Sequence, residues 1–175
     1  MTKRYTHNPL KYYKLDPSVK EPIFATEGSA CFDIHAHIPS ETEIKIRDEF
    51  GHEATLKSDK SDNFILALSW TALIPTGLIF DIPFGWMVRL YARSGLAFKQ
   101  GLILANSVGI IDSDYVDPVF VMVKNTTSRP IVIKNGTRIC QGQMDMVSKY
   151  NLVEVPERPA QKTDRDGGFG STGTK

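Results

Sequence analysis

The chain has 175 residues, long enough for one domain with a proper hydrophobic core. Its 21 basic and 20 acidic residues leave a formal net charge of +1, so no strong basic field marks it as a protein that coats nucleic acid. Two cysteines cannot build a disulfide framework and fit a reducing compartment. No apolar run approaches a membrane span and the first residues lack the apolar core of a signal peptide, so we expect a cytoplasmic protein, or one in the host-cell cytoplasm if the source is viral.

The expected elements are mostly short strands. After a first strand around Asp33, the stretch 41–63 is charged and interrupted by turn formers, and we interpret it as a long hairpin or surface excursion. Further strands are expected at 64–70, 78–83, 86–91, 119–123, 130–133, 138–147 and 151–155. Asn135-Gly136 predicts a hairpin between two of these strands, and a short helix is expected only at 94–100.

Many short strands with regular turns indicate an all-β sandwich or jelly roll. We expect this β domain to cover residues 1–155. The stretch 156–164 is rich in proline and charge and resembles a linker that leads into a flexible, glycine-rich C-terminal arm, so 156–175 forms the second part of the chain.

The arm, RDGGFGSTGTK, has a composition suited to a nucleotide. Its glycines let backbone N–H groups approach an anion, Ser171 and Thr172 add hydroxyl donors, and Phe169 offers a flat ring that can cover a base. The alternative is an ordinary disordered chain end.

Three other segments carry polar groups at strand ends. Arg93, Ser94 and Gly95 suit a phosphate, although Ser94 as the N-cap of a helix is the alternative. Gln141 can donate to a phosphoryl oxygen or be an edge residue. Asp33 is either a strand-end aspartate bonded to the backbone or a carboxylate near a metal-bound phosphate.

The segment GIIDSDY, residues 109–115, places two carboxylates and a tyrosine in an otherwise apolar run. A water nucleophile needs a carboxylate that orients it and accepts its proton. Together with a lid for phosphate and base, this segment suggests hydrolysis of a nucleotide.

In this order, SACFDIHA, RSGLA, NSVGIIDSDY, RICQ and GGFGSTG resemble the five motifs of the trimeric dUTPases, and the resemblance covers about residues 25–173. The third and fifth motifs are the specific ones, because the related dCTP deaminases carry a segment similar to RSGLA. The resemblance implies a β jelly roll, hydrolysis of dUTP to dUMP and pyrophosphate with Mg²⁺, and a homotrimer whose three subunits share each active site. Such an enzyme keeps uracil out of DNA and supplies dUMP; no membrane and no stable nucleic-acid partner is expected.

The resemblance also implies a role for each matching residue. Asp112 orients the attacking water and is the catalytic residue. Tyr115 packs under the deoxyribose, and Asp33 lies near the magnesium, through water. The implied substrate-binding residues are Arg93, Ser94, Gly95, Asn106, Gly109, Ile111, Tyr115, Gln141, Arg165, Phe169, Gly170, Ser171 and Thr172.

The chain departs from the family pattern at five places, one of which is the stretch 41–63, longer than the family usually has between its first two motifs. Cys31 stands where glycine is usual, Ala92 where proline is usual, and Asp117-Pro118 where glycine and a polar residue are usual. The arm is one residue shorter than usual between Arg165 and GGFG. Two other functions compete: a dCTP deaminase or bifunctional deaminase-diphosphatase, and a non-catalytic dUTP-binding regulator. Asp112 and the full GGFGSTG arm favour the dUTPase.

Overall fold

The computed structural model describes residues 9–164 of the chain. Within that range the predicted all-β class is confirmed, and no helix there is long and apolar enough to cross a bilayer. The elements are β1 Lys11–Lys14, β2 Ile23–Phe24, β3 Phe32–His35, β4 Glu43–Arg47, β5 Glu53–Lys57, β6 Asn63–Leu66, β7 Thr71–Pro75, β8 Leu78–Asp81, β9 Trp86–Tyr91, α1 Ser94–Gln100, β10 Leu102–Leu104, β11 Val108–Asp112, β12 Phe120–Asn125, β13 Ile131–Lys134 and β14 Arg138–Met146.

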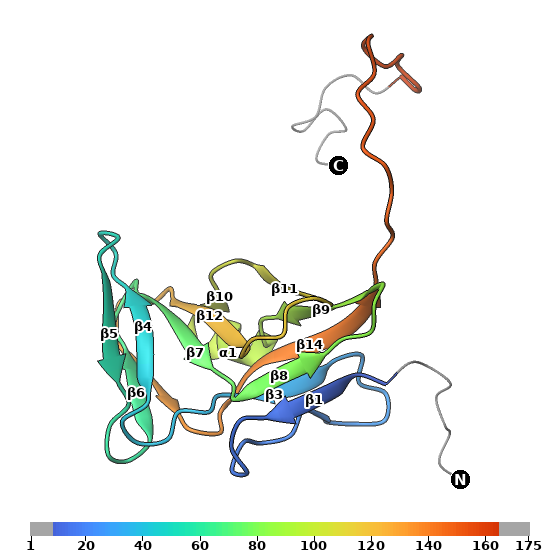
Figure 1. Cartoon of the computed structure of the whole chain (residues 1–175). Helices are drawn as coiled ribbons and strands as arrows, with labels where there is room; N and C mark the ends of the chain where they lie inside the picture. The colour runs from blue at the N-terminus through green and yellow to red at the C-terminus, as the bar shows by residue number, and fades with distance from the viewer. Residues whose placement is uncertain (1–8, 165–175) are drawn as a thin grey trace.

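Two five-stranded sheets make up the body of the protein (Figure 1). One has the order β10-β12-β7-β4-β5 and the other β11-β9-β14-β3-β2, and neighbouring strands run antiparallel. Two smaller pairs, β1-β8 and β13-β6, complete the fold. After β14 the chain leaves the sheets as an extended segment that projects away from the body (Figure 1).

The core follows from alternation along the strands. In β12, Val121 and Val123 are buried while Met122 and Lys124 are exposed, as expected where successive side chains point to opposite faces. β3 is the exception, because all four of its residues are buried, including its two polar ones. A strand buried on both faces must find partners for its polar groups, which makes β3 a place to look for a site.

The stretch 41–63 forms the β4–β5 hairpin and the start of β6. β4 also pairs with β7, and Ile44 and Ile46 enter the core, so this stretch extends a sheet. The turn is closed by Asp48, whose Oδ1 accepts the backbone N–H groups of Phe50 and His52 at 2.9 and 2.8 Å.

Three strand expectations are wrong. The strand expected at 64–70 is too long, because β6 ends at Leu66 and the chain turns before β7 begins at Thr71. Asn135-Gly136 does form a turn, with Gly136 at φ +75°, but β13 pairs with β6 whereas β14 pairs with β3 and β9. The turn therefore connects two sheets and is not a hairpin. Residues 151–155 form no strand, since within the described residues this segment has no neighbouring strand with which to pair.

Candidate active site

Helix α1 begins directly after β9 and presents Ser94 and Gly95 to solvent in its first turn. Its bounds agree with the sequence prediction. The N-cap residue is Arg93, without a side-chain capping bond, so the alternative that Ser94 is the N-cap is wrong. The helix ends at Gly101, which adopts φ 64° and donates its N–H to the carbonyl of Ala97 at 3.1 Å.

A buried carboxylate beside this helix joins three elements. Asp33 of β3 has a side chain that is only 8% exposed; its Oδ1 lies 3.1 Å from Nε of Arg93, and its Oδ2 lies 3.1 Å from Nη1 of Arg138. Arg93 also donates from Nη1 to the carbonyl of Arg138 at 3.2 Å. Gln141 of β14 lies opposite Asp33 in the sheet. Five of the predicted site residues thus gather at one end of this sheet: Asp33, Arg93, Ser94, Gly95 and Gln141.

Sequence reasoning gave no role to Arg138. A buried aspartate in a strand needs a cationic partner, and that need is the signal that could have identified Arg138. His35, two residues along β3, is also buried, and its Nδ1 has no hydrogen-bond partner in the described part of the chain. Burial lowers the pKa of His35, and Lys20 lowers it further.

A pocket of about 300 Å³ lies beside β11 and holds four other predicted residues, Asn106, Gly109, Ile111 and Tyr115. Its walls are apolar and include Leu73 and Met122. A mostly apolar cavity with a few polar groups is the usual form of a small-molecule site.

The backbone around this pocket is tightly constrained. Ser107 adopts φ 62° in the turn that leads into β11. A Cβ on Gly109 would lie 3.1 Å from Cβ of Leu90, so a side chain there would press on β9. Tyr115 donates its N–H to the carbonyl of Asp112 at 3.1 Å and its hydroxyl to the carbonyl of Pro118 at 3.0 Å. The backbone carbonyl of Pro118 therefore holds the tyrosine hydroxyl in place.

Asp112 is the last residue of β11, and its side chain is exposed. It pairs across the sheet with Met87, whereas Gln141 pairs with Tyr91 at the other end of β9. Four residues of strand separate these rows, roughly 13 Å. Gly109 of the pocket pairs with Leu90, next to the row of Gln141, so the pocket reaches the Gln141 end of β9 whereas Asp112 lies at the other end.

Mg²⁺ prefers near-octahedral oxygen ligands. Both carboxylate oxygens of Asp33 already face guanidinium groups, and the described residues contain no cluster of three His, Cys, Asp or Glu side chains that could hold a metal. A direct bond from Asp33 to a metal ion does not fit this arrangement. Contact through water stays a prediction.

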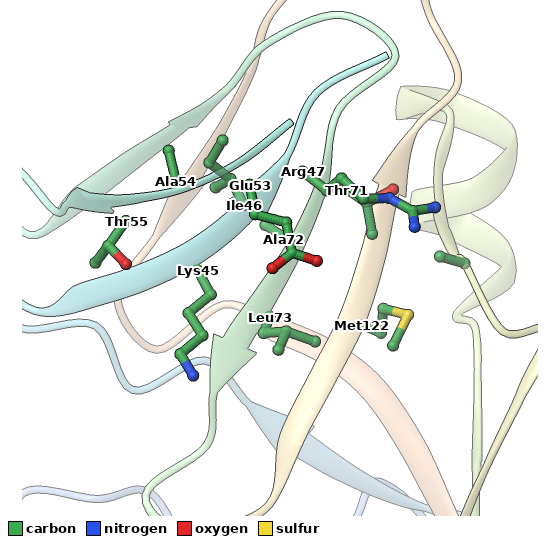
Figure 2. Close-up of a pocket in the computed structure, with 11 residues that line it drawn as sticks. Lys45, Ile46, Arg47, Glu53, Ala54, Thr55, Thr71, Ala72, Leu73 and Met122 are labelled. Carbon is green, nitrogen blue, oxygen red and sulfur yellow. The ribbon is translucent and has the colours of Figure 1, made fainter. Parts of the chain in front are cut away.

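A second hollow, of about 470 Å³, lies between β4, β5 and β7 (Figure 2). It shares Leu73 and Met122 with the pocket at β11 but includes none of the predicted site residues. Its charged lining residues, Lys45, Arg47 and Glu53, come from the β4–β5 hairpin.

The arm residues expected to close on a substrate lie outside the described residues, and their roles stay predictions. These are Arg165, Phe169, Gly170, Ser171 and Thr172.

Residues 52–173 match the family model described as dUTPase. Among curated proteins, the chain is 46% identical over 153 residues to the deoxyuridine 5'-triphosphate nucleotidohydrolase of Rhizobium johnstonii, covering 87% of this chain and 84% of that protein. It is 34% identical over 165 residues to the protein of the same name from Nautilia profundicola, and the match covers 94% of this chain and 98% of that protein.

Solved structures show the same fold. A Staphylococcus bacteriophage 80alpha dUTPase variant with dUpNHpp superposes with a TM-score of 0.72 at 20% identity, covering 95% of this chain and 99% of that one. The Streptococcus mutans dUTPase superposes with a TM-score of 0.63 at 22% identity, and the match covers 82% of this chain and 99% of that one. A variant of the dUTPase from phage phi11 of S. aureus, described with a structural Mg(II) ion, superposes with a TM-score of 0.67 at 18% identity. That match covers 87% of this chain and 100% of that one.

Proposed function

The chain belongs to the dUTPase family, and from that membership we propose that it is an enzyme that hydrolyses dUTP to dUMP and pyrophosphate. The observation that carries the proposal is the pocket at β11, where Asn106, Gly109, Ile111 and Tyr115 meet. These are the residues that the family resemblance assigns to the uracil and the deoxyribose, and they lie apart in sequence by up to nine positions.

Each half of the candidate site suits one half of the substrate. The apolar pocket at β11 suits the nucleoside. The cationic cluster around Asp33, with the exposed backbone of Ser94 and Gly95 beside it, suits a triphosphate, because arginine and free N–H groups are strong phosphate donors. Asp112 stands at the edge of the nucleoside half, where an exposed carboxylate can orient a water for attack on the α-phosphorus.

We assign the two halves of one site to different subunits of a homotrimer. The rows of Asp112 and Gln141 are about 13 Å apart along β9, so the carboxylate proposed to orient the water lies far from Gln141 of the same chain. The segment after β14 exposes Tyr150, Leu152 and Val153, which suits contact with another chain. The arm beyond it would then close over a neighbour's site, with Phe169 on the base and Arg165, Gly170, Ser171 and Thr172 at the phosphates.

Mg²⁺ is the proposed cofactor, and it neutralises phosphate charge when it is bound. Magnesium sites at nucleotides rely on the phosphates and on water more than on a protein cage, which agrees with the arginine-paired state of Asp33. Accordingly, no protein residue of this site is assigned a direct bond to the metal.

The decisive experiment measures pyrophosphate release from each of the four common dNTPs, from dUTP and from UTP, with Mg²⁺ and with EDTA. Release from dUTP alone, dependent on Mg²⁺, is expected. Ammonia release from dCTP would indicate a deaminase instead, and dUTP binding without turnover would indicate a regulator.

A further inference from the structure

The carboxylate of Asp33 is fully engaged by arginine. Each oxygen accepts from a different guanidinium at 3.1 Å, and the carboxylate is buried while Arg93 and Arg138 remain 27% and 47% exposed. Neither arginine has another carboxylate partner in the described part of the chain. The carboxylate of Asp33 thus holds both guanidinium groups from their buried side and leaves their solvent-facing edges free.

The cluster is cationic as a whole. Two guanidinium groups and one carboxylate sum to one positive charge, and the neutral amide of Gln141 adds none. Burial and Lys20 lower the pKa of His35 on the same strand, which disfavours an additional positive charge there. A cluster of this sign attracts an anion and repels a metal ion.

Arginine needs a fixed orientation to bind a phosphate with both arms of its fork. Arg93 is fixed twice, by Asp33 and by the carbonyl of Arg138. Arg138 is fixed by Asp33 at the point where β14 carries a bulge, between Arg138 and Cys140. Without the carboxylate, the two guanidinium groups would repel each other and lose this orientation.

We propose that Asp33 is a positioning residue that holds Arg93 and Arg138 as a paired clamp for the phosphate chain, and that it is not a ligand of Mg²⁺. The proposal rests on the proposed function only for the identity of the phosphate chain as part of a nucleotide. Arg138 thereby becomes a phosphate-binding residue.

Removal of the Asp33 charge should change anion binding in opposite directions for the clamp and for a simple charge effect. Calorimetry with inorganic tripolyphosphate in EDTA measures anion binding without any metal. Coulomb's law alone predicts that Asp33→Asn strengthens binding, because a negative charge leaves the site. The clamp predicts that Asp33→Asn weakens it, on the order of 10- to 100-fold, because the arginines lose their orientation. Weaker binding supports the clamp, and equal or tighter binding overturns it.

Arg138→Lys tests the same geometry if Asp33→Asn fails to fold. Lysine keeps the charge but has no fork, so weaker tripolyphosphate binding is expected, and wild-type affinity would overturn the clamp. Arg129→Gln is the matched control for loss of one exposed arginine charge, since its side chain has no ion pair in the described structure. It should leave tripolyphosphate binding within about twofold of wild type at 0.15 M salt.

A double-mutant cycle separates positioning from general destabilisation. In an Arg138→Gln background, Asp33→Asn should weaken tripolyphosphate binding much less than it does alone, because the carboxylate acts through that arginine. Equal effects in both backgrounds would contradict the proposal. Hydrolysis of dUTP by the wild-type protein is measured separately. If the protein does not hydrolyse dUTP but Asp33→Asn still weakens tripolyphosphate binding, the proposed function is wrong and the clamp stands. If the protein hydrolyses dUTP but Asp33→Asn does not weaken tripolyphosphate binding, only the clamp is wrong.

Discussion

Gln141 and Asp112 flank the same strand, β9, from opposite ends: Gln141 lies opposite Tyr91, and Asp112 lies opposite Met87. The offset is about 13 Å along a rigid strand, so side-chain movement within one chain does not bring the two groups to one phosphorus atom. A site that uses both residues has to take them from two chains.

Mixed trimers provide a direct test of this arrangement. Asp112→Asn and Gln141→Ala should each abolish most dUTP turnover. When equal amounts of the two variants are unfolded and refolded together, about one quarter of the sites should combine an intact Asp112 from one subunit with an intact Gln141 from another. Turnover should then recover to about one quarter of wild type, measured by pyrophosphate release. No recovery, with trimers present by light scattering, would mean that each site lies within one chain.

The sequence predicted the local elements well and their partners poorly. The short helix expected at 94–100 matches α1, and the structure ends it at Gly101, which adopts the left-handed conformation common at helix ends. The pairing of β13 with β6 was missed, since Asn135-Gly136 encodes a turn but not which sheet the next strand joins. Likewise Asp33 was marked by its apolar neighbours, whereas its partner Arg138, 105 residues away in sequence, depends on the sheet register.

Sugar selection should depend on the ring of Tyr115. The ring lines the pocket at β11 and is held there by the bond from its hydroxyl to the carbonyl of Pro118. Tyr115→Ala opens space for a 2′-hydroxyl, so the ratio of kcat/KM for dUTP to that for UTP should fall by about tenfold or more. Tyr115→Phe keeps the ring and loses only the hydrogen bond, and it should retain most of the discrimination. Unchanged discrimination in Tyr115→Ala would move the selection to another residue.

Gly109→Ala should damage both stability and activity. The added methyl group would lie 3.1 Å from Cβ and 3.3 Å from Cδ1 of Leu90, and Leu90 is itself buried. Overpacking of this kind costs about 1–3 kcal/mol, so the thermal midpoint and kcat/KM for dUTP should both fall. Gly28→Ala is the control, because a methyl group there meets no atom within 4 Å. Equal melting of the two variants would contradict this packing of β11 on β9.

The two thiols should react slowly in the native protein. Burial raises the pKa of Cys31, with a further contribution from Asp145, and burial raises the pKa of Cys140 well above the ordinary range. The thiolate is the nucleophile, so a raised pKa lowers the reactive fraction at any pH below it. At pH 8, a chromogenic disulfide reagent should label Cys31 more slowly than it labels a free cysteine, and Cys140 only in denaturant. Rapid labelling of both thiols without denaturant would contradict the burial of Cys140.

Asp112→Asn should separate binding from turnover. The carbonyl of Asp112 accepts the Tyr115 N–H that closes the turn, and this backbone bond survives the substitution. Asparagine keeps the shape of the side chain but cannot accept a proton from water. The variant should therefore bind dUpNHpp with Mg²⁺ as wild type does and lose about 10²–10⁴-fold in kcat for dUTP, the usual contribution of a general base.

Asp114→Asn and Asp117→Asn are the matched controls, because both carboxylates are exposed on the same loop but lie beyond the end of β11. Each should keep kcat within about threefold of wild type, since neither is held on the strand that borders the pocket. Calorimetry with dUpNHpp and single-turnover hydrolysis of dUTP give the two readouts. Normal turnover in Asp112→Asn with an inactive Asp114→Asn would shift the base by two residues. If all three variants hydrolyse dUTP normally, none of these carboxylates activates the water, and the proposed mechanism is wrong.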